Sequence, residues 1–299
     1  MNFTKLPNFF LIGAAKAGTT SLYDILKQHP QVYLPFQKEP MFFSNDNNFN
    51  RGMEWYSHTF FQQAAGYPAR GEATPHYLYW SDKVAPRIRQ IYEMNEIKFV
   101  VILRDPVKRA YSWYWNMVKE GMEELTFELA IKEEDHRLKD NQNTLQKTGA
   151  MTYGYIKGGC YSTALQPFLD NFPRQDFIFI LQEDLNSGYL ASVKRLLEFL
   201  GINQDFLPNL VSSNQATQPR SRRVQSILRG QSKFREFLKL LFPLQFRYAL
   251  KKRLLRANEV KVTYPDLDPV LEAELRVRFA PEVRRLEQII DQDLSNWLP

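Results

Sequence analysis

Three short apolar runs lie along the chain, each bounded by polar residues or glycine. They are Asn8–Gly13, Lys98–Leu103 and Asp176–Leu181. Runs of this length that are rich in Ile, Val, Leu and Phe are typical of strands in a sheet covered on both faces. We therefore predict three buried strands, with a further short strand and turn at Gly71–Pro75.

The stretches between these strands carry apolar residues at helical spacing. Asp105 is a good N-cap and Pro106 suits the first helical position, so a helix is predicted over Pro106–Glu120, ending at Gly121. Residues 31–81 and 138–158 are interpreted as largely irregular, the first rich in aromatic side chains. Further helices are predicted at Thr19–Gln28, from a cap at Asp82 to Met94, and at Thr126–Arg137, Ser162–Phe172 and Ser187–Leu200.

Strands that alternate with helices indicate a parallel sheet with right-handed crossovers. The predicted fold class is α/β, a P-loop-like central parallel β-sheet flanked by helices, with a helical C-terminal extension. The chain becomes polar and basic after about residue 208, with helices predicted at Ser232–Ala257 and Pro269–Asp291. We expect a single domain over residues 1–299, in which 1–207 form the α/β core and 208–299 form a basic segment and helices that pack on it.

Composition agrees with a soluble globular protein. The 299 residues are 44% hydrophobic and 14% aromatic, enough to fill a sizeable core. Cys160 is the one cysteine, so no intrachain disulfide can form, which fits a reducing compartment. The sequence has no basic and apolar leader and no run of eighteen apolar residues. We therefore expect a cytoplasmic protein.

The net charge of +6 favours an anionic partner. Residues 233–256 mix basic and aromatic side chains, which suits peripheral membrane contact, a polyanion, or two helices that pack on the core. No nucleic-acid recognition motif accompanies the charge, so we expect no nucleic-acid partner.

The loop Gly13–Thr20 joins the first strand to the first helix. Its glycines allow backbone N–H groups to approach a phosphate, and the helix N-terminus favours negative charge. Lys16 adds positive charge, and Thr19, Thr20 and Ser21 add hydroxyl groups. The glycine spacing matches a Walker A loop, but Lys16 lies inside the loop and Thr19 stands where that motif has lysine. The alternative is a turn that needs glycine at two positive-φ positions.

Arg104 ends the second predicted strand, and in open parallel sheets ligands bind at the carboxyl ends of the strands. A guanidinium there suits bidentate recognition of a phosphate. Ser112, eight residues on, is expected near the same face of the following helix. Alternatively, Arg104 pairs with Asp105 or with another acid.

These motifs resemble the sulfotransferases that use 3′-phosphoadenylyl sulfate, and in particular the heparan-sulfate type with its bacterial relatives. Lys16–Thr20 resembles their 5′-phosphosulfate loop, and Arg104–Ser112 resembles their 3′-phosphate site. The resemblance runs in order along nearly the whole chain. Supporting stretches are His29–Val32, Lys38–Phe43, Gly71–Pro75, Gly159–Leu165 and Asp293–Trp297.

The resemblance implies roles for individual residues. Lys16 would contact the oxygen that bridges phosphate and sulfate, and Arg104 with Ser112 would bind the 3′-phosphate. The segment Pro219–Arg222 resembles the family's basic segment that closes over the cofactor. The implied cofactor-binding set is Lys16, Ala17, Gly18, Thr19, Thr20, Ser21, Arg104, Ser112, Tyr161, Arg220 and Ser221.

Sulfuryl transfer needs a cation at the leaving oxygen and a base for the acceptor hydroxyl. We assign the first role to Lys16. For the base we choose Glu39, on the expectation that a semi-apolar cleft raises its pKa, and the resemblance agrees because the heparan-sulfate type has a glutamate here. A surface Lys38–Glu39 pair is the alternative. His76 is the competing base, since the cytosolic branch of the superfamily uses histidine.

The chain departs from the resembled enzymes at Ala73, where they carry lysine before Thr-Pro, and this argues against an anionic glycosaminoglycan. The acceptor hydroxyl stays open among carbohydrate, lipid or polyketide, and small alcohol. The scattered histidines predict no metal site. Two other functions compete: a P-loop kinase, which would need lysine directly after Gly18, and a nucleotide- or glycan-binding module without turnover.

Overall fold

The computed structural model describes residues 5–92, 97–209, 217–221, 253–254 and 257–299. Its centre is a five-stranded sheet with the order β2-β3-β1-β4-β5, in which every neighbouring pair is parallel. This confirms the predicted α/β fold class. The strands are β1 (Phe9–Gly13), β2 (Val32–Tyr33), β3 (Ala69–Ala73), β4 (Lys98–Leu103) and β5 (Phe177–Leu181).

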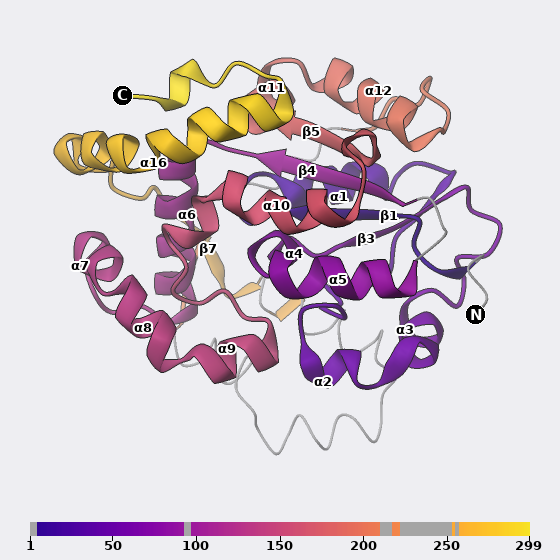
Figure 1. Cartoon of the computed structure of the whole chain (residues 1–299), viewed down its shortest axis with the longest axis horizontal. Coiled ribbons are helices and arrows are strands. Elements are labelled where there is room, and N and C mark those ends of the chain that lie inside the picture. The colour runs from indigo at the N-terminus through magenta and orange to yellow at the C-terminus, as the bar shows by residue number, and fades with distance from the viewer. Residues whose placement is uncertain (1–4, 93–96, 210–216, 222–252, 255–256) are drawn as a thin grey trace.

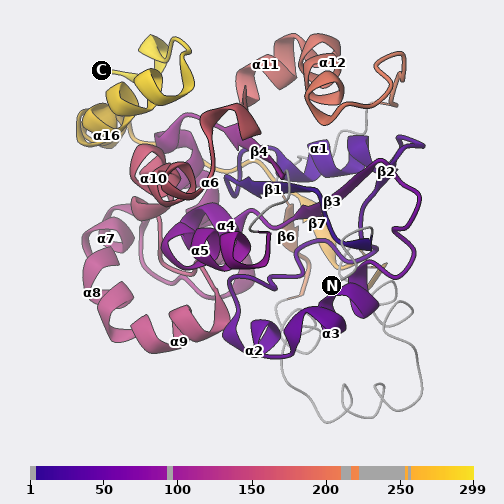
Figure 2. The same ribbon diagram turned by 45° about the vertical axis from the view of Figure 1, so that its right-hand side comes forward.

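Helices cover both faces of this sheet. Figures 1 and 2 show α4, α5 and α10 on one face and α1 and α12 on the other, as expected for right-handed crossovers. The helices of the first half are α1 (Thr19–Leu26), α2 (Asp46–Phe49), α3 (Gly52–Phe60), α4 (His76–Tyr79), α5 (Ser81–Ile91) and α6 (Pro106–Glu120). Those of the second half are α7 (Phe127–Lys132), α8 (Glu134–Asp140), α9 (Gln142–Thr148), α10 (Tyr161–Asn171), α11 (Gln182–Ser187), α12 (Tyr189–Leu200) and α16 (Pro269–Ile290).

The core is centred on β4, whose last five residues are buried. The ring of Phe99 stacks on those of Phe10 and Phe177 from the two neighbouring strands. The ends of α6 are as predicted, because the Asp105 carboxylate accepts the backbone N–H of Val107 at 2.9 Å and Gly121 closes the helix in a left-handed conformation.

Two stretches that were predicted to be irregular contain regular structure. Residues 31–81 hold β2, α2, α3 and α4, and residues 138–158 hold α9. The predicted helix over Thr126–Arg137 is divided at Glu133 into α7 and α8. These helices have nine residues or fewer, a length at which local propensity alone is marginal and tertiary contacts decide.

The C-terminal part contacts the core through α16. Arg276 on α16 donates to the Asp105 carboxylate at 3.0 Å, and Phe279 is buried against Gly159. A short antiparallel ribbon, β6 (Thr217–Pro219) with β7 (Glu259–Lys261), lies beside α6 and was not predicted.

The predicted helix at Ser232–Ala257, and with it the basic stretch 233–256, falls almost wholly outside the described residues. No helix in the described part of the chain is long and apolar enough to span a membrane.

Candidate active site

The loops that follow β1, β3 and β4 meet at the carboxyl edge of the sheet. The backbone N–H of Ala14, after β1, donates to Ile102 of β4 at 2.6 Å. The N–H of Thr74, after β3, donates to Leu11 of β1 at 3.1 Å. Glu39 approaches the same edge, because its N–H donates to the carbonyl of Ala73 at 3.0 Å. Backbone bonds thus bring together motifs that lie far apart in the sequence.

The two glycines of the first loop serve different purposes. Gly18 has φ 104° and is the N-cap of α1, where no side chain caps the helix. Gly13 has no positive φ; a Cβ there would lie 2.6 Å from the Cβ of Leu78 in α4. Only Gly18 therefore needs the left-handed region, and the alternative of a turn with two positive-φ glycines is wrong. The first turn of α1 offers backbone N–H groups to an anion.

Lys16 occupies a costly backbone conformation. Its φ of 73° lies in the left-handed region, which a non-glycine residue adopts at a cost of about 1–3 kcal/mol, most often at functional sites. Its pKa is lowered to about 8, because the ammonium is withdrawn from water and because Lys119, Arg104 and Lys38 repel it, while Glu39 acts in the opposite direction. An anion placed among these cations would relieve the repulsion.

The other predicted residues of this loop lie at the start of α1. Ala17 and Thr19 are buried, Ser21 is half-buried and Thr20 is exposed. Thr20 is thus the most exposed of these four residues.

Arg104 is brought next to the glycine-lysine loop. One of its terminal nitrogens donates to the carbonyl of Lys16 at 3.1 Å. The Asp105 carboxylate is occupied by the N-terminus of α6 and by Arg276, so it does not pair with Arg104. Among the described residues Arg104 has no ion pair, and its buried Nε has no hydrogen-bond partner. A half-buried guanidinium that forms no ion pair with the described residues is a fitting ligand for a phosphate.

Two other predicted residues lie near Arg104 in the fold. The buried Tyr161 hydroxyl donates to the Arg104 carbonyl at 2.9 Å, so Tyr161 holds the backbone at the strand end. Ser112 is half-buried on α6, the helix that starts directly after Arg104.

Glu39 is also held in the left-handed region, with φ 63°. Its carboxylate binds the ammonium of Lys38 at 2.6 Å, and the side chain is 36% exposed. Partial burial opposes ionisation, but Lys38, His76 and Lys16 outweigh it and hold the pKa of Glu39 below its ordinary value. The expected rise in the pKa of Glu39 is therefore wrong, and the group is a carboxylate at neutral pH.

His76, the competing base, begins α4 beside Glu39. Its Nδ1 is buried and has no partner among the described residues, and its ring lies edge-on to Trp113 at 6.0 Å between centroids. Burial and the charge of Lys38 lower the pKa of His76, against the effect of Glu39. The imidazole is neutral at neutral pH, so the structure places two deprotonated candidate bases next to each other.

A buried carboxyl group that sequence reasoning missed supports both loops. Glu72 on β3 is fully buried and accepts the hydroxyls of Thr74, at 2.6 Å, and Tyr56. The Tyr77 hydroxyl in turn accepts the N–H of Phe43 at 3.1 Å, in the segment that follows Glu39. Burial raises the pKa of Glu72. The hydroxyl groups around this carboxyl fix the segments that carry Glu39 and His76.

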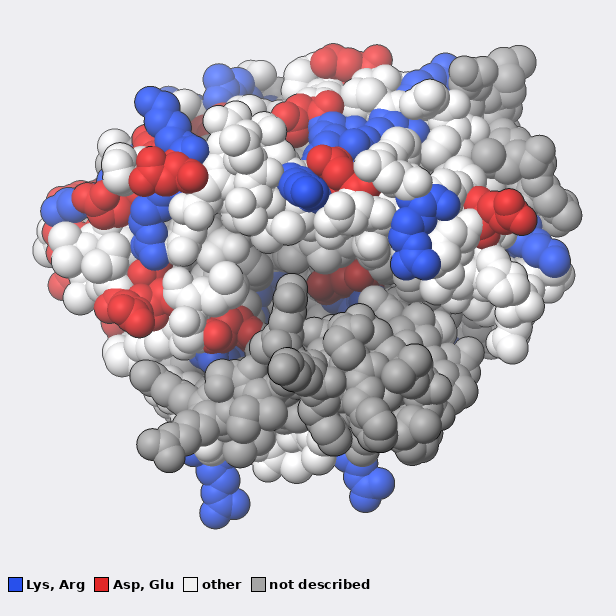
Figure 3. Space-filling view, turned by 90° about the horizontal axis from the view of Figure 1, so that it is seen from below, with Lys and Arg blue, Asp and Glu red and all other residues white. Residues whose placement is uncertain are grey.

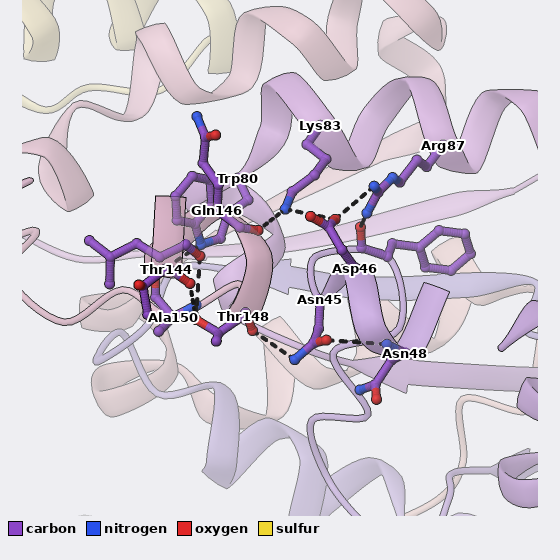
Figure 4. Close-up of polar contacts among 12 residues, drawn as sticks. Asn45, Asp46, Asn48, Trp80, Lys83, Arg87, Thr144, Gln146, Thr148 and Ala150 are labelled. Atoms are coloured by element: carbon purple, nitrogen blue, oxygen red, sulfur yellow. Dashed lines mark hydrogen bonds and ion pairs between the residues drawn. The ribbon is translucent and has the colours of Figure 1, made fainter. Parts of the chain in front are cut away.

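The segment after Glu39 is also tied to α5 and α9 (Figure 4). Asp46 binds Lys83 at 3.2 Å and Arg87 at 2.8 Å, and Lys83 also donates to the carbonyl of Gln146. The Asn45 amide donates to the carbonyl of Thr148 at 2.9 Å. These contacts explain why α2 and α9 form, since each is stabilised by partners far away in the sequence.

Arg220 and Ser221 belong to the chain that leaves the ribbon. The N–H of Arg220 donates to the Asn258 carbonyl at 2.6 Å, and Ser221 exchanges two hydrogen bonds with the Asn258 side chain. The Arg220 side chain is exposed. Both residues are placed near α6 by the ribbon, whose Thr217 accepts a hydrogen bond from Lys119 at 2.6 Å.

In the part of the chain that the structure describes, no group of three His, Cys, Asp or Glu side chains is arranged to hold a metal ion. The face seen in Figure 3 has a hollow with basic and acidic side chains inside it, while the surrounding surface carries interspersed charges of both signs.

The arrangement is typical of an enzyme that transfers a group from a phosphorylated donor. A cationic loop at a helix N-terminus, a second cation that forms no ion pair with the described residues, and two candidate bases lie at the carboxyl edge of a parallel sheet, where such donors bind. A sequence model described as the sulfotransferase domain matches residues 6–238. The chain therefore belongs to the sulfotransferase domain family.

Known relatives agree with this assignment. Human heparan sulfate glucosamine 3-O-sulfotransferase 5 is 28% identical over 98% of this chain and 74% of its own length. Human bifunctional heparan sulfate N-deacetylase/N-sulfotransferase 2 is 28% identical over 66% of this chain. The matched part is only 22% of that protein's own length. The crystal structure of a sulfotransferase from Alicyclobacillus acidocaldarius matches with a TM-score of 0.70 and 28% identity, over 97% of this chain and 98% of the other.

Proposed function

We propose that the enzyme transfers the sulfuryl group of 3′-phosphoadenylyl sulfate to an acceptor hydroxyl, with Glu39 as the general base. The observation that carries the proposal is the grouping of Lys16, Arg104 and Glu39 at one edge of the sheet, joined by the Arg104–Lys16 hydrogen bond of 3.1 Å. This donor carries a 5′-phosphosulfate and a 3′-phosphate on its ribose. It therefore fits two separate cationic sites better than a ligand with one phosphate group does.

The residues present fit this donor. The N-terminus of α1 and the ammonium of Lys16 would receive the phosphosulfate. The guanidinium of Arg104, whose Nε has no partner among the described residues, would receive the 3′-phosphate together with the Ser112 hydroxyl. Arg220 and Ser221 would contact the donor from the ribbon side. Tyr161 would act through Arg104, whose carbonyl it binds.

The reaction exchanges one S–O bond for another. The acceptor oxygen forms a bond to sulfur, the bond between sulfur and the bridging oxygen breaks, and the acceptor proton passes to the Glu39 carboxylate. Lys16 would stabilise the charge that develops on the bridging oxygen, an effect of about 3–4 kcal/mol by comparison with single oxyanion donors. Positioning of the two reactants contributes up to about 7–11 kcal/mol. Lys38 holds the Glu39 carboxylate in an ion pair. When Glu39 takes the proton, the Lys38 ammonium must move away or bind the other carboxylate oxygen.

The relatives named as heparan sulfate enzymes favour a carbohydrate hydroxyl as acceptor. Ala73 is buried, and its carbonyl binds the N–H of Glu39, so the position where the resembled enzymes carry lysine lies beside the proposed base. We infer that the acceptor carries no anionic group close to the reacting hydroxyl. A cytoplasmic location remains part of the proposal.

The decisive experiment is incubation with radiolabelled 3′-phosphoadenylyl sulfate and a panel of acceptors that includes neutral saccharides, heparan sulfate fragments, long-chain alcohols and small alcohols. We expect label on a neutral saccharide. Donor that is neither bound nor consumed, with Lys16→Met equal to the wild type, would overturn the proposal. Transfer to heparan sulfate alone would overturn the inference about the acceptor.

Glu39→Gln tests the base, with His76→Asn as the matched variant. We expect Glu39→Gln to lower kcat by about 10²–10⁴-fold while the affinity for adenosine 3′,5′-bisphosphate, measured by calorimetry, stays the same. His76→Asn should lower kcat far less, since we place the base at Glu39. The reverse ranking of the two variants would move the role of base to His76.

A further inference from the structure

Lys119 is a cation near the proposed site, and it belongs to none of the motifs found in the sequence. It lies in the last turn of α6, fifteen residues after Arg104, and its charge acts on Lys16 more strongly than that of Arg104 or Lys38. The side chain is only 15% exposed. Among the described residues the cluster therefore has four cations, Lys16, Lys38, Arg104 and Lys119, beside the carboxylates of Glu39 and Glu259.

The Lys119 ammonium has one unused donor. It binds the carboxylate of Glu259 at 2.6 Å and the hydroxyl of Thr217 at 2.6 Å, one acceptor from each strand of the ribbon. An ammonium has three N–H groups, and no third partner lies among the described residues. One donor is thus left for an oxygen of a ligand, while the other two fix the side chain in place.

The position of Lys119 on α6 points toward the donor. Ser112, Trp115 and Lys119 are spaced i, i+3 and i+7, so they share one face of the helix, about 10 Å from end to end. Trp115 on this face stacks on Tyr264 at 4.6 Å and an interplanar angle of 5°. The Tyr264 hydroxyl donates to the carbonyl of Thr217 at 3.1 Å. The ribbon is therefore held against the face of α6 that carries Ser112.

We propose that Lys119 is a further binding residue for the anionic sulfuryl donor, held in position by Glu259 and Thr217 of the ribbon. This inference rests on the proposed function. The third N–H of Lys119 donates to a phosphate or sulfuryl oxygen of the donor. The cluster holds four cations and two carboxylates, so Lys119 and Lys16 repel each other when no ligand is bound. The negative charge of the donor offsets this repulsion.

Calorimetry with adenosine 3′,5′-bisphosphate, the product of the donor, tests the proposal. Lys119→Met keeps the length of the side chain and removes its charge; we expect about tenfold weaker binding and a raised donor KM with little change in kcat. Lys132→Met is the matched control, because Lys132 is 65% exposed on α7 and pairs with Glu128. It should bind like the wild type. Thermal unfolding checks that both variants are folded.

Glu259→Gln separates donor binding from a merely structural contact. In this variant the amide oxygen of glutamine can still accept the hydrogen bond of Lys119, so the side chain stays in place, while one negative charge near the donor is removed. We therefore expect affinity equal to or tighter than that of the wild type. Weakening by Glu259→Gln as large as that by Lys119→Met would show that Lys119 only holds the ribbon, and would overturn the inference.

Two outcomes distinguish this inference from the proposed function. If the wild type binds the bisphosphate and Lys119→Met binds equally well, the inference alone is wrong. If the wild type does not bind it at all, the proposed donor is wrong and the role of Lys119 falls with it.

Discussion

At the scale of single residues, the site concentrates unfavourable features that a donor anion would relieve. Lys16 and Glu39 both adopt positive φ, and Arg104 keeps a buried nitrogen without a partner among the described residues. Such features persist where the surrounding structure holds them and the function uses them. The ion pair of Lys38 with Glu39 lies in the same site and helps to lower the pKa of the proposed base.

The lowered pKa of Lys16 predicts a pH dependence. The ammonium is charged below its pKa of about 8 and neutral above it, so kcat/KM for the donor should fall as the pH rises from 7 to 9. A pH profile of donor kcat/KM measures this fall. In Lys16→Arg, whose guanidinium stays charged, the fall near pH 8 should disappear. An unchanged profile in that variant would assign the fall to another group.

At the scale of elements, close approaches fix how the strands and helices meet. Gly13→Ala would bring a methyl group within 2.6 Å of the Leu78 side chain, because α4 packs directly on the end of β1. We expect a loss of about 1–3 kcal/mol in the free energy of unfolding, measured by chemical denaturation. A cycle with Leu78→Gly, which removes the Cβ at 2.6 Å as well as the rest of the side chain, should show strong coupling between the two positions. Additive effects would contradict this contact.

The buried Glu72 network predicts a second effect at the same scale. Tyr56→Phe removes a hydroxyl that donates to the buried carboxyl, and we expect a loss of about 1–3 kcal/mol in the free energy of unfolding. Tyr67→Phe, at an exposed tyrosine, is the control and should lose little. Because the network supports the segments of Glu39 and His76, kcat should fall in Tyr56→Phe while donor affinity stays near that of the wild type.

At the scale of the whole molecule, the C-terminal helix is fastened to the donor side of the sheet. Arg276 of α16 binds Asp105, which in turn caps α6 directly after Arg104. The net charge of the chain is +6, but the positive charge relevant to donor binding is the local cluster around Lys16. The contact between α6 and α16 therefore lies next to the proposed donor site.

Arg276→Met tests this connection. The variant leaves the Asp105 carboxylate with only the helix N-terminus as partner, so we expect a loss of about 1–3 kcal/mol in the free energy of unfolding and a modest rise in donor KM. Arg285→Met, also on α16 but 60% exposed, should change neither quantity. A donor KM that rises equally in both variants would contradict a specific role for the Arg276 contact.

The sequence by itself determined β1, β4, β5 and α6 and the two cofactor-type motifs, because apolar runs, caps and glycine loops are local signals. The helices α1, α5, α10, α12 and α16 were likewise predicted, within a few residues of their observed bounds. The tertiary structure decided other features. The short helices α2 and α9 form through contacts between residues about a hundred positions apart, as between Asn45 and Thr148. The pKa of Glu39 falls rather than rises because the fold adds His76 and Lys16 to the effect of Lys38, its neighbour in the sequence. Lys119 joins the cation cluster for the same reason: no local pattern encodes the distance between side chains from separate elements.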